Sequence, residues 1–336
     1  MNYNSIPPQP PVTPYHLTEE YKETQSIKKD SNAISIGFLI YFSLTLITVP
    51  NILRIIKIFT VPYKNNPEFK GIDPVIYYLM FSILLITVLV PSFYISTLIS
   101  KNNISNIIQF NKFDKKLCFA AIGVTMACFV YGDLASQSFL KNLNSLGIHS
   151  KIPKAPYDNN VLSIIMYAIG IAIVSPLVEE FVFRGVILGS LRKYGDGFAI
   201  IISSILFGFT PENLSQIPLA FIYGLALSFL TVRFNSILPA IIAHFLNNLF
   251  RVGLDIISYN STEITSNIAK SVYFIALAVI GTICLAYVLK KDNRFFSISR
   301  STSIFSLKKR IKIFLFSPAI ILVLILMLIL PLKTLI

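Results

Sequence analysis

Charged residues are scarce in this sequence. Asp, Glu, Lys and Arg make up only 13% of the 336 residues, whereas soluble domains usually carry about 25%. Hydrophobic residues make up 54% of the chain, and the mean hydropathy is +0.69. This composition excludes an ordinary soluble protein.

Cysteine is also rare. The chain has three cysteines, each within an apolar segment: Cys118, Cys128 and Cys284. Their spacing matches no pattern of metal ligands and does not suggest a disulfide framework. We therefore expect buried, unreactive thiols.

Apolar segments of about 20 residues recur along the chain, and this is the length that a helix needs to cross the hydrocarbon core of a bilayer. The sequence therefore predicts an all-α, polytopic transmembrane helical bundle with about eight or nine membrane-spanning helices. The nine candidate segments are 34–53, 74–99, 117–136, 161–183, 197–210, 215–232, 236–257, 268–289 and 313–332. The fifth is short for a span, and the residues after the fourth could form a separate helix.

Acidic residues are outnumbered by basic ones, and the net charge is +13. In a membrane protein the basic residues collect in cytoplasmic loops and contact anionic headgroups, so no nucleic-acid partner is expected. If the N-terminus is cytoplasmic, eighteen Lys and Arg residues lie inside and ten outside. The bias predicts a cytoplasmic N-terminus and an external C-terminus.

The chain divides into four predicted parts. Residues 1–33 are polar and proline-rich, and we expect a flexible tail. Residues 34–159 hold the front transmembrane helices, and residues 160–257 form a core. Residues 258–336 hold trailing helices joined by a basic linker at 290–312. Of these parts, only the core has a cluster of polar residues at membrane depth.

The core carries the segment SPLVEEFVFRGVILG at residues 175–189. Ionisable side chains in the bilayer cost roughly 2.5–3.5 kcal/mol each, and they persist where they have partners. Glu180 and Arg184 are four residues apart, so they share one helical face and can pair. Glu179 points about 100° away and is free for another role. A structural ion pair that joins two helices would explain the first two residues.

A second polar pair lies in LPAIIAHFLNNLF at residues 238–250, where His244 and Asn248 are again four residues apart on one helical face. Each residue alone could simply form hydrogen bonds between helices. Together with the first segment they supply a carboxylate that can take a proton from water. They also supply imidazole and amide donors that can stabilise an oxyanion.

These residues resemble the CPBP family, also called the Abi or CAAX-protease family. PLVEEFVFRG at residues 176–185 is similar to its EExxxR motif, and HFLNN is similar to its HxxxN motif, with His244 and Asn248 in register. The resemblance covers about residues 160 to 250. It implies a membrane-embedded hydrolase, an intramembrane metalloprotease or endopeptidase that cuts near the membrane face.

The second family motif, FxxxH, is incomplete. In FGFTPEN at residues 207–213, Phe207 begins the motif and Pro211 takes the place of the histidine. The other two histidines, His16 and His149, lie outside the apolar segments. Glu212 and Asn213 are next to the altered position and are candidates to substitute for the missing side chain.

The resemblance implies a role for each matching residue. Glu179 would be the general base, Glu180 and Arg184 would form a supporting pair, and His244 and Asn248 would donate to the oxyanion. Zinc is the cofactor that the resemblance suggests, but zinc usually takes at least three protein ligands and one histidine is missing. The cofactor and metal ligands are therefore left unassigned.

Three functions fit these residues. The first is a peptidase that hydrolyses a membrane-associated protein or peptide through Glu179, His244 and Asn248. The second is a catalytically impaired family member that acts as a membrane scaffold or regulator of a partner membrane protein, or gives self-immunity to a bacteriocin. The third is a transporter, because buried carboxylates also mark ion pathways, but the sequence has no inverted repeat.

In each case the protein is integral to a membrane, and we expect the bacterial plasma membrane. The expected partners are the lipid bilayer and either a membrane-associated substrate or a partner membrane protein. Asp133, near the end of the third segment, is expected to cap its helix or contact headgroups.

Overall fold

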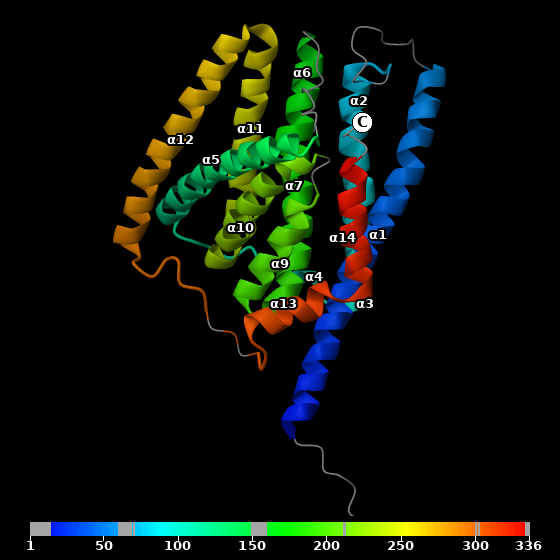
Figure 1. Ribbon diagram of the computed structural model, residues 1–336, viewed down its shortest axis with the longest axis vertical. Helices are drawn as coiled ribbons and strands as arrows, with labels where there is room; N and C mark the ends of the chain where they lie inside the picture. The colour runs from blue at the N-terminus through cyan, green and yellow to red at the C-terminus, as the bar shows by residue number, and fades with distance from the viewer. Residues whose placement is uncertain are drawn as a thin grey trace, which may run out of the picture.

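The computed structural model describes residues 15–59, 69, 71–148, 160–210, 213–299, 301 and 303–332. Within these ranges the chain is almost entirely helical, and Figure 1 shows the helices arranged as one bundle. In the described part of the chain, seven helices are long and apolar enough to cross a membrane, and a bent pair near the C-terminus makes up to eight. The predicted all-α polytopic bundle is therefore confirmed.

The front of the bundle is built from the first helices of the chain. Each span is helical because a helix satisfies its own backbone hydrogen bonds, which the hydrocarbon core of a bilayer cannot do. The bounds are α1 Tyr15–Phe59, α2 Pro74–Leu84, the π-helical η2 Leu85–Leu89, α3 Val90–Ser100, the short α4 Ile104–Ile107 and α5 Lys115–Ser145. Segments α2, η2 and α3 form one continuous span.

The core follows. It consists of α6 Val161–Ala168, η3 Ile169–Val174, α7 Ser175–Glu180, η4 Phe181–Leu188, α8 Gly189–Leu191, η5 Arg192–Tyr194, α9 Asp196–Gly208, η6 Leu214–Gln216, α10 Ile217–Phe234 and α11 Leu238–Asn260. The segments from α6 to η5 form one span, Val161–Tyr194, so the residues after 183 continue the fourth predicted helix. With 13 residues, α9 extends only about 20 Å and is too short to cross the bilayer alone.

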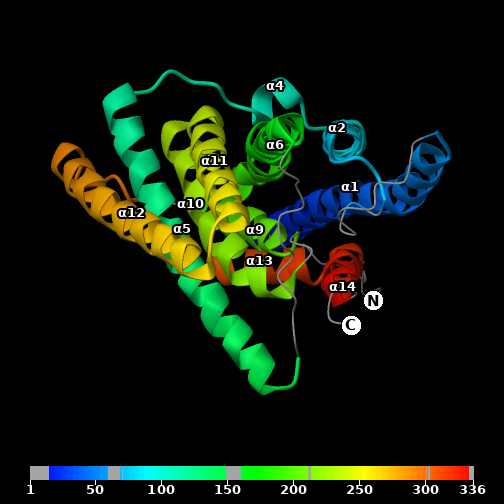
Figure 2. The same cartoon turned by 90° about the horizontal axis from the view of Figure 1, so that it is seen from above.

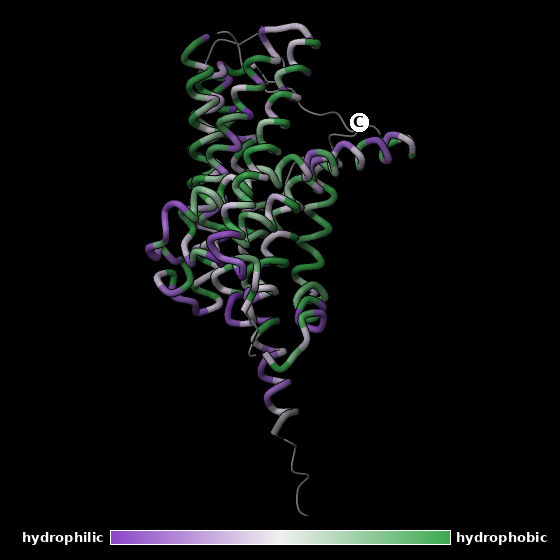
Figure 3. The backbone as a smooth tube through the Cα atoms, turned by 90° about the vertical axis from the view of Figure 1, so that its left-hand side faces the viewer, coloured by the Kyte–Doolittle hydropathy of each residue, from purple (hydrophilic) through white to green (hydrophobic). Residues whose placement is uncertain are grey.

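The chain ends with three helices, α12 Glu263–Lys291, α13 Leu307–Leu315 and α14 Pro318–Leu332. A bend of 74° separates α13 from α14. The short helices α4 and α13 and the end of α12 lie at the end of the bundle where α1 begins (Figure 1). Figure 3 shows hydrophilic residues gathered at this end and hydrophobic residues along the middle of the helices.

The first helix begins earlier than the sequence predicts. Residues 15–33 were expected to belong to a flexible tail, but α1 includes them; residues 1–14 lie outside the described part. Tertiary contacts explain the difference, because Asp30 is buried and its carboxylate is 2.7 Å from the Lys193 ammonium. The Tyr194 hydroxyl also donates to Asp30. The polar composition of residues 15–33 therefore gave a wrong prediction of where the first helix begins.

The helix α5 lies across the direction of the other long helices, as Figures 1 and 2 show. It packs mainly against α10 and α12. Small residues allow the close approach to α12, as is common between membrane helices. A Cβ on Gly123 would lie 2.6 Å from the Cys284 sulfur, and a Cβ on Gly281 would overlap the Cβ of Ala127.

An added methyl group at Gly281 should therefore destabilise the bundle. We expect Gly281→Ala to lower the free energy of unfolding by about 1–3 kcal/mol, since overpacking forces the helices apart. The matched control is Gly253→Ala on α11, where nothing lies within 4 Å of the added Cβ. Thermal melting of the purified protein in detergent compares the two variants. Equal melting temperatures would contradict the packing described for α5 and α12.

Candidate active site

The span that carries the predicted acids is wound unevenly. The α-helical α7, Ser175–Glu180, lies between two π-helical segments, η3 and η4. Such π-turns are rare and often occur at functional sites. A proline provides a local cause, because Pro176 has no N–H to donate to the preceding turn. The carbonyl of Ile171 in η3 instead accepts a hydrogen bond of 2.9 Å from the Asn248 amide on α11.

The predicted pair between Glu180 and Arg184 is formed and is completely buried. Arg184 Nη1 donates to Glu180 Oε1 at 2.9 Å, and Arg184 Nη2 donates to the Gly224 carbonyl on α10 at 3.2 Å. The guanidinium also lies over the Phe207 ring of α9, with 4.3 Å to the ring centre. One ion pair thus joins η4 to two neighbouring helices.

His244 reaches the same carboxylate from α11. Its Nδ1 is 2.7 Å from Glu180 Oε1, so this single oxygen serves both Arg184 and the imidazole. The imidazole is 5% exposed and meets the rings of Phe207 and Tyr223 edge to face. Because the Glu180 carboxylate is an acceptor, we infer that the imidazole donates from Nδ1, which leaves Nε2 toward Glu179.

Glu179 lies on the other side of His244. Its Oε2 is 4.0 Å from His244 Nε2, and its Oε1 accepts a hydrogen bond from the Ser175 hydroxyl. The side chain is 26% exposed, whereas Glu180 and Arg184 are 0% exposed. The more accessible carboxylate therefore faces the free nitrogen of the imidazole.

The structure brings four of the five predicted site residues into direct contact: Glu179, Glu180, Arg184 and His244. Asn248 lies one turn further along α11, where its amide binds the Ile171 carbonyl. This bond uses one of its two N–H groups. Asn248 is therefore beside the site and tethered to η3.

The remaining candidates lie elsewhere or cannot be placed. Asp133 on α5 bonds to Gln137, away from the four clustered residues. Pro211 and Glu212 fall outside the described residues. Asn213 caps the turn at Ser215 through its side-chain oxygen.

Sequence reasoning missed two residues that shape the site, Ser175 and Tyr223. It named Phe207 as the start of the second motif but did not predict that its ring packs against the imidazole. The position of Ser175, four residues before Glu179, was the available signal. The role of the rings depends on helix packing and has no comparable signal in the sequence.

The residues in place do not fit a zinc centre. Within the described ranges, no group of three or more His, Cys, Asp or Glu side chains is arranged to hold a metal ion. His244 Nδ1 and Glu180 Oε1 are already bonded to each other, which leaves Glu179 and His244 Nε2 as two potential ligands. Structural and catalytic zinc sites use at least three protein ligands.

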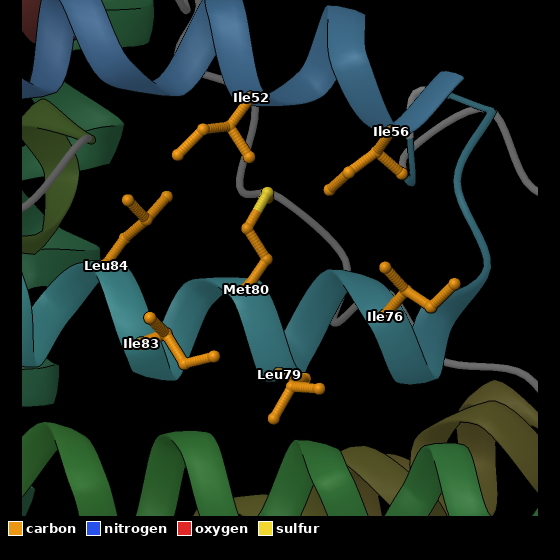
Figure 4. Close-up of a pocket in the computed structure, with 7 residues that line it drawn as sticks. All are labelled: Ile52, Ile56, Ile76, Leu79, Met80, Ile83 and Leu84. Carbon is orange, nitrogen blue, oxygen red and sulfur yellow. The ribbon is translucent and has the colours of Figure 1, made fainter. Parts of the chain in front are cut away.

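Two cavities lie away from this cluster. One, of about 270 Å³, is lined by seven apolar side chains of α1 and α2 (Figure 4). The other, of about 450 Å³, is polar and lies between α4, α8 and the end of α10. Neither includes any of the five predicted site residues.

A comparison with protein families identifies the core. Residues 161–250 match the family described as type II CAAX prenyl endopeptidase Rce1-like. The core of the chain is therefore similar to the CAAX-protease family. The resemblance drawn from the two motifs is thereby confirmed, and together with the apolar helices it makes the chain an integral membrane protein.

A curated relative also supports the similarity to membrane peptidases. A protein of Bacillus subtilis (strain 168) named "Putative membrane peptidase YdiL" is 31% identical over 137 residues. These residues are 40% of this chain and 55% of the relative, so the chain spans about half the length of the protein it matches. No solved structure shows significant similarity to this chain.

The buried ion pair of this CAAX-protease-like core is open to a stability test. Arg184→Met would leave the Glu180 carboxylate buried beside His244 without its cation. We therefore expect the free energy of unfolding to fall by about 3–5 kcal/mol. The matched control is Arg251→Met, because Arg251 on α11 is exposed. Melting temperatures of the purified variants provide the measurement.

The double variant Glu180→Gln/Arg184→Met removes the uncompensated charge and should recover part of the loss. An Arg184→Met protein as stable as the Arg251→Met control would show that the pair does not hold these helices together.

Proposed function

We propose that the protein is a membrane-embedded endopeptidase that hydrolyses a peptide bond of a membrane-associated protein or peptide. The observation that carries this proposal is the Glu179–His244 pair, whose two free acceptors face each other across 4.0 Å. Similarity to a family of membrane endopeptidases supports it.

The gap between the two acceptors suits a water molecule. A water that forms hydrogen bonds of about 2.8 Å to both Glu179 Oε2 and His244 Nε2 would donate both of its hydrogens, at an angle near 90°. Its lone pairs would then point away from the two bases and toward a substrate. The proposed nucleophile is this water, activated by Glu179 as general base.

The reaction would proceed in two steps. In the first, the water oxygen attacks the peptide carbonyl carbon while one water proton passes to Glu179. This attack converts the substrate carbonyl into a tetrahedral oxyanion. In the second, the C–N bond breaks and the proton passes to the leaving amine, directly or through His244 Nε2. The products are a carboxylic acid and an amine.

Glu180 and Arg184 would act through His244. The Glu180 carboxylate holds Nδ1–H, so the ring keeps Nε2 toward Glu179 and is stabilised whenever it takes a proton. Once protonated, Nε2–H becomes a donor to the oxyanion, as the family resemblance implies. The second N–H of Asn248 is the other candidate donor.

The proposed setting is the bacterial plasma membrane, with the N-terminus in the cytoplasm. The contacts of α1 with basic residues support a shared side for the N-terminus and the basic linker, since Glu20 binds Lys309 and Asp30 binds Lys193. Cytoplasmic segments of membrane proteins are rich in Lys and Arg.

Substitution of the two facing residues tests the peptidase. In lipid vesicles, the purified protein is incubated with a library of single-span membrane peptides, and products are identified by mass spectrometry. We expect Glu179→Gln and His244→Gln each to slow cleavage by about 10²–10⁴-fold, because each removes an acid–base group. The control is Glu263→Gln, an exposed acid at the start of α12. Cleavage at the control rate by both site variants would refute the assignment.

Pro211 favours a second function, since the family has a histidine there. In this alternative the chain keeps the fold and binds a partner membrane protein as a scaffold or regulator, or gives bacteriocin self-immunity. The same variants separate the two functions in cells. A scaffold would keep its biological activity in the Glu179→Gln and His244→Gln variants, whereas a peptidase would lose it.

A further inference from the structure

Ser175 lies one helical turn before Glu179 and donates its hydroxyl to Glu179 Oε1. We propose that Ser175 is a positioning residue, which holds the Glu179 carboxylate so that Oε2 faces His244 Nε2. The proposal rests on the proposed peptidase function and assigns a residue that none of the three family motifs includes.

Glu179 needs such a partner more than Glu180 does. Glu180 is held by Arg184 and His244 and is completely buried. Glu179 is 26% exposed, and within the described part of the chain its one hydrogen bond comes from Ser175. Without that bond, rotation about the side-chain torsions of Glu179 would turn Oε2 away from the imidazole.

The hydrogen bond also makes the two carboxylate oxygens different. Oε1 is engaged by the hydroxyl, so Oε2 keeps its lone pairs for the proton of a water or a leaving amine. A base must lie within hydrogen-bond reach of the proton that it takes, and its orientation therefore affects the rate directly.

Ser175 is itself held in place. It is 8% exposed and is the first residue of α7, directly after the π-turn η3 and before Pro176. The Asn248 amide fixes this π-turn through the Ile171 carbonyl. Asn248 and His244 lie on the same face of α11, so one helix sets the positions of both Ser175 and the imidazole.

The hydroxyl of Ser175 can be removed with little change in volume. We expect Ser175→Ala to lower kcat by about 10- to 100-fold with KM nearly unchanged, because a hydrogen bond to a charged group is lost only from the catalytic base. Ser175→Thr keeps the hydroxyl and should restore most of kcat. The assay is the vesicle cleavage assay, with melting temperatures measured for every variant.

The matched control is Ser163→Ala. Ser163 lies in α6 of the same span and is 0% exposed, and its hydroxyl has no hydrogen-bond partner among the described residues. The kcat of the Ser163→Ala variant should equal that of the unmodified protein. A normal kcat in Ser175→Ala would overturn the proposal, as would equal losses in Ser175→Ala and Ser175→Thr.

A second measurement does not depend on cleavage. In a double-mutant cycle on thermal stability, Ser175→Ala and Glu179→Ala should be non-additive, because each removes one partner of the same hydrogen bond. Additive effects would overturn the proposal even for an inactive protein. If the unmodified protein cleaves nothing while the cycle shows coupling, the peptidase function fails and the hydrogen bond stands.

Discussion

The site depends on burying an ion pair between helices at membrane depth. Glu180 and Arg184 are both 0% exposed, so bulk solvent does not screen their charges. Further contacts offset the cost of burying such a pair. Gly224 of α10, Phe207 of α9 and His244 of α11 provide these contacts, whereas Glu180 Oε2 and Arg184 Nε have no hydrogen-bond partner among the described residues. The ion pair therefore gathers three helices around η4 and determines where the imidazole lies.

The π-turn η3 is connected to the same helix, α11. Pro176 cannot complete the backbone bonding of its turn, and α11 compensates with the side chain of Asn248. Contacts at His244 and Asn248, one turn apart, then fix α11 against the span Val161–Tyr194. The π-helical turn before the two acids is thus linked to the helix of the histidine.

Part of this architecture could be predicted from the sequence. The apolar segments indicated the spans, and spacings of four residues placed Glu180 with Arg184 and His244 with Asn248. The start of α1 could not be predicted, because the burial of Asp30 against Lys193 depends on distant parts of the chain. The orientation of His244 and the bond from Asn248 to Ile171 depend on the π-turns, which shift the register of the helix.

The central claim is that Glu179 and His244 act on one water molecule as a unit. A double-mutant cycle on the rate of peptide cleavage tests it most directly. If the claim holds, the Glu179→Gln/His244→Gln protein should be no slower than the slower of the two single variants, since groups that act together lose their effect together. Losses that multiply in the double variant would contradict it.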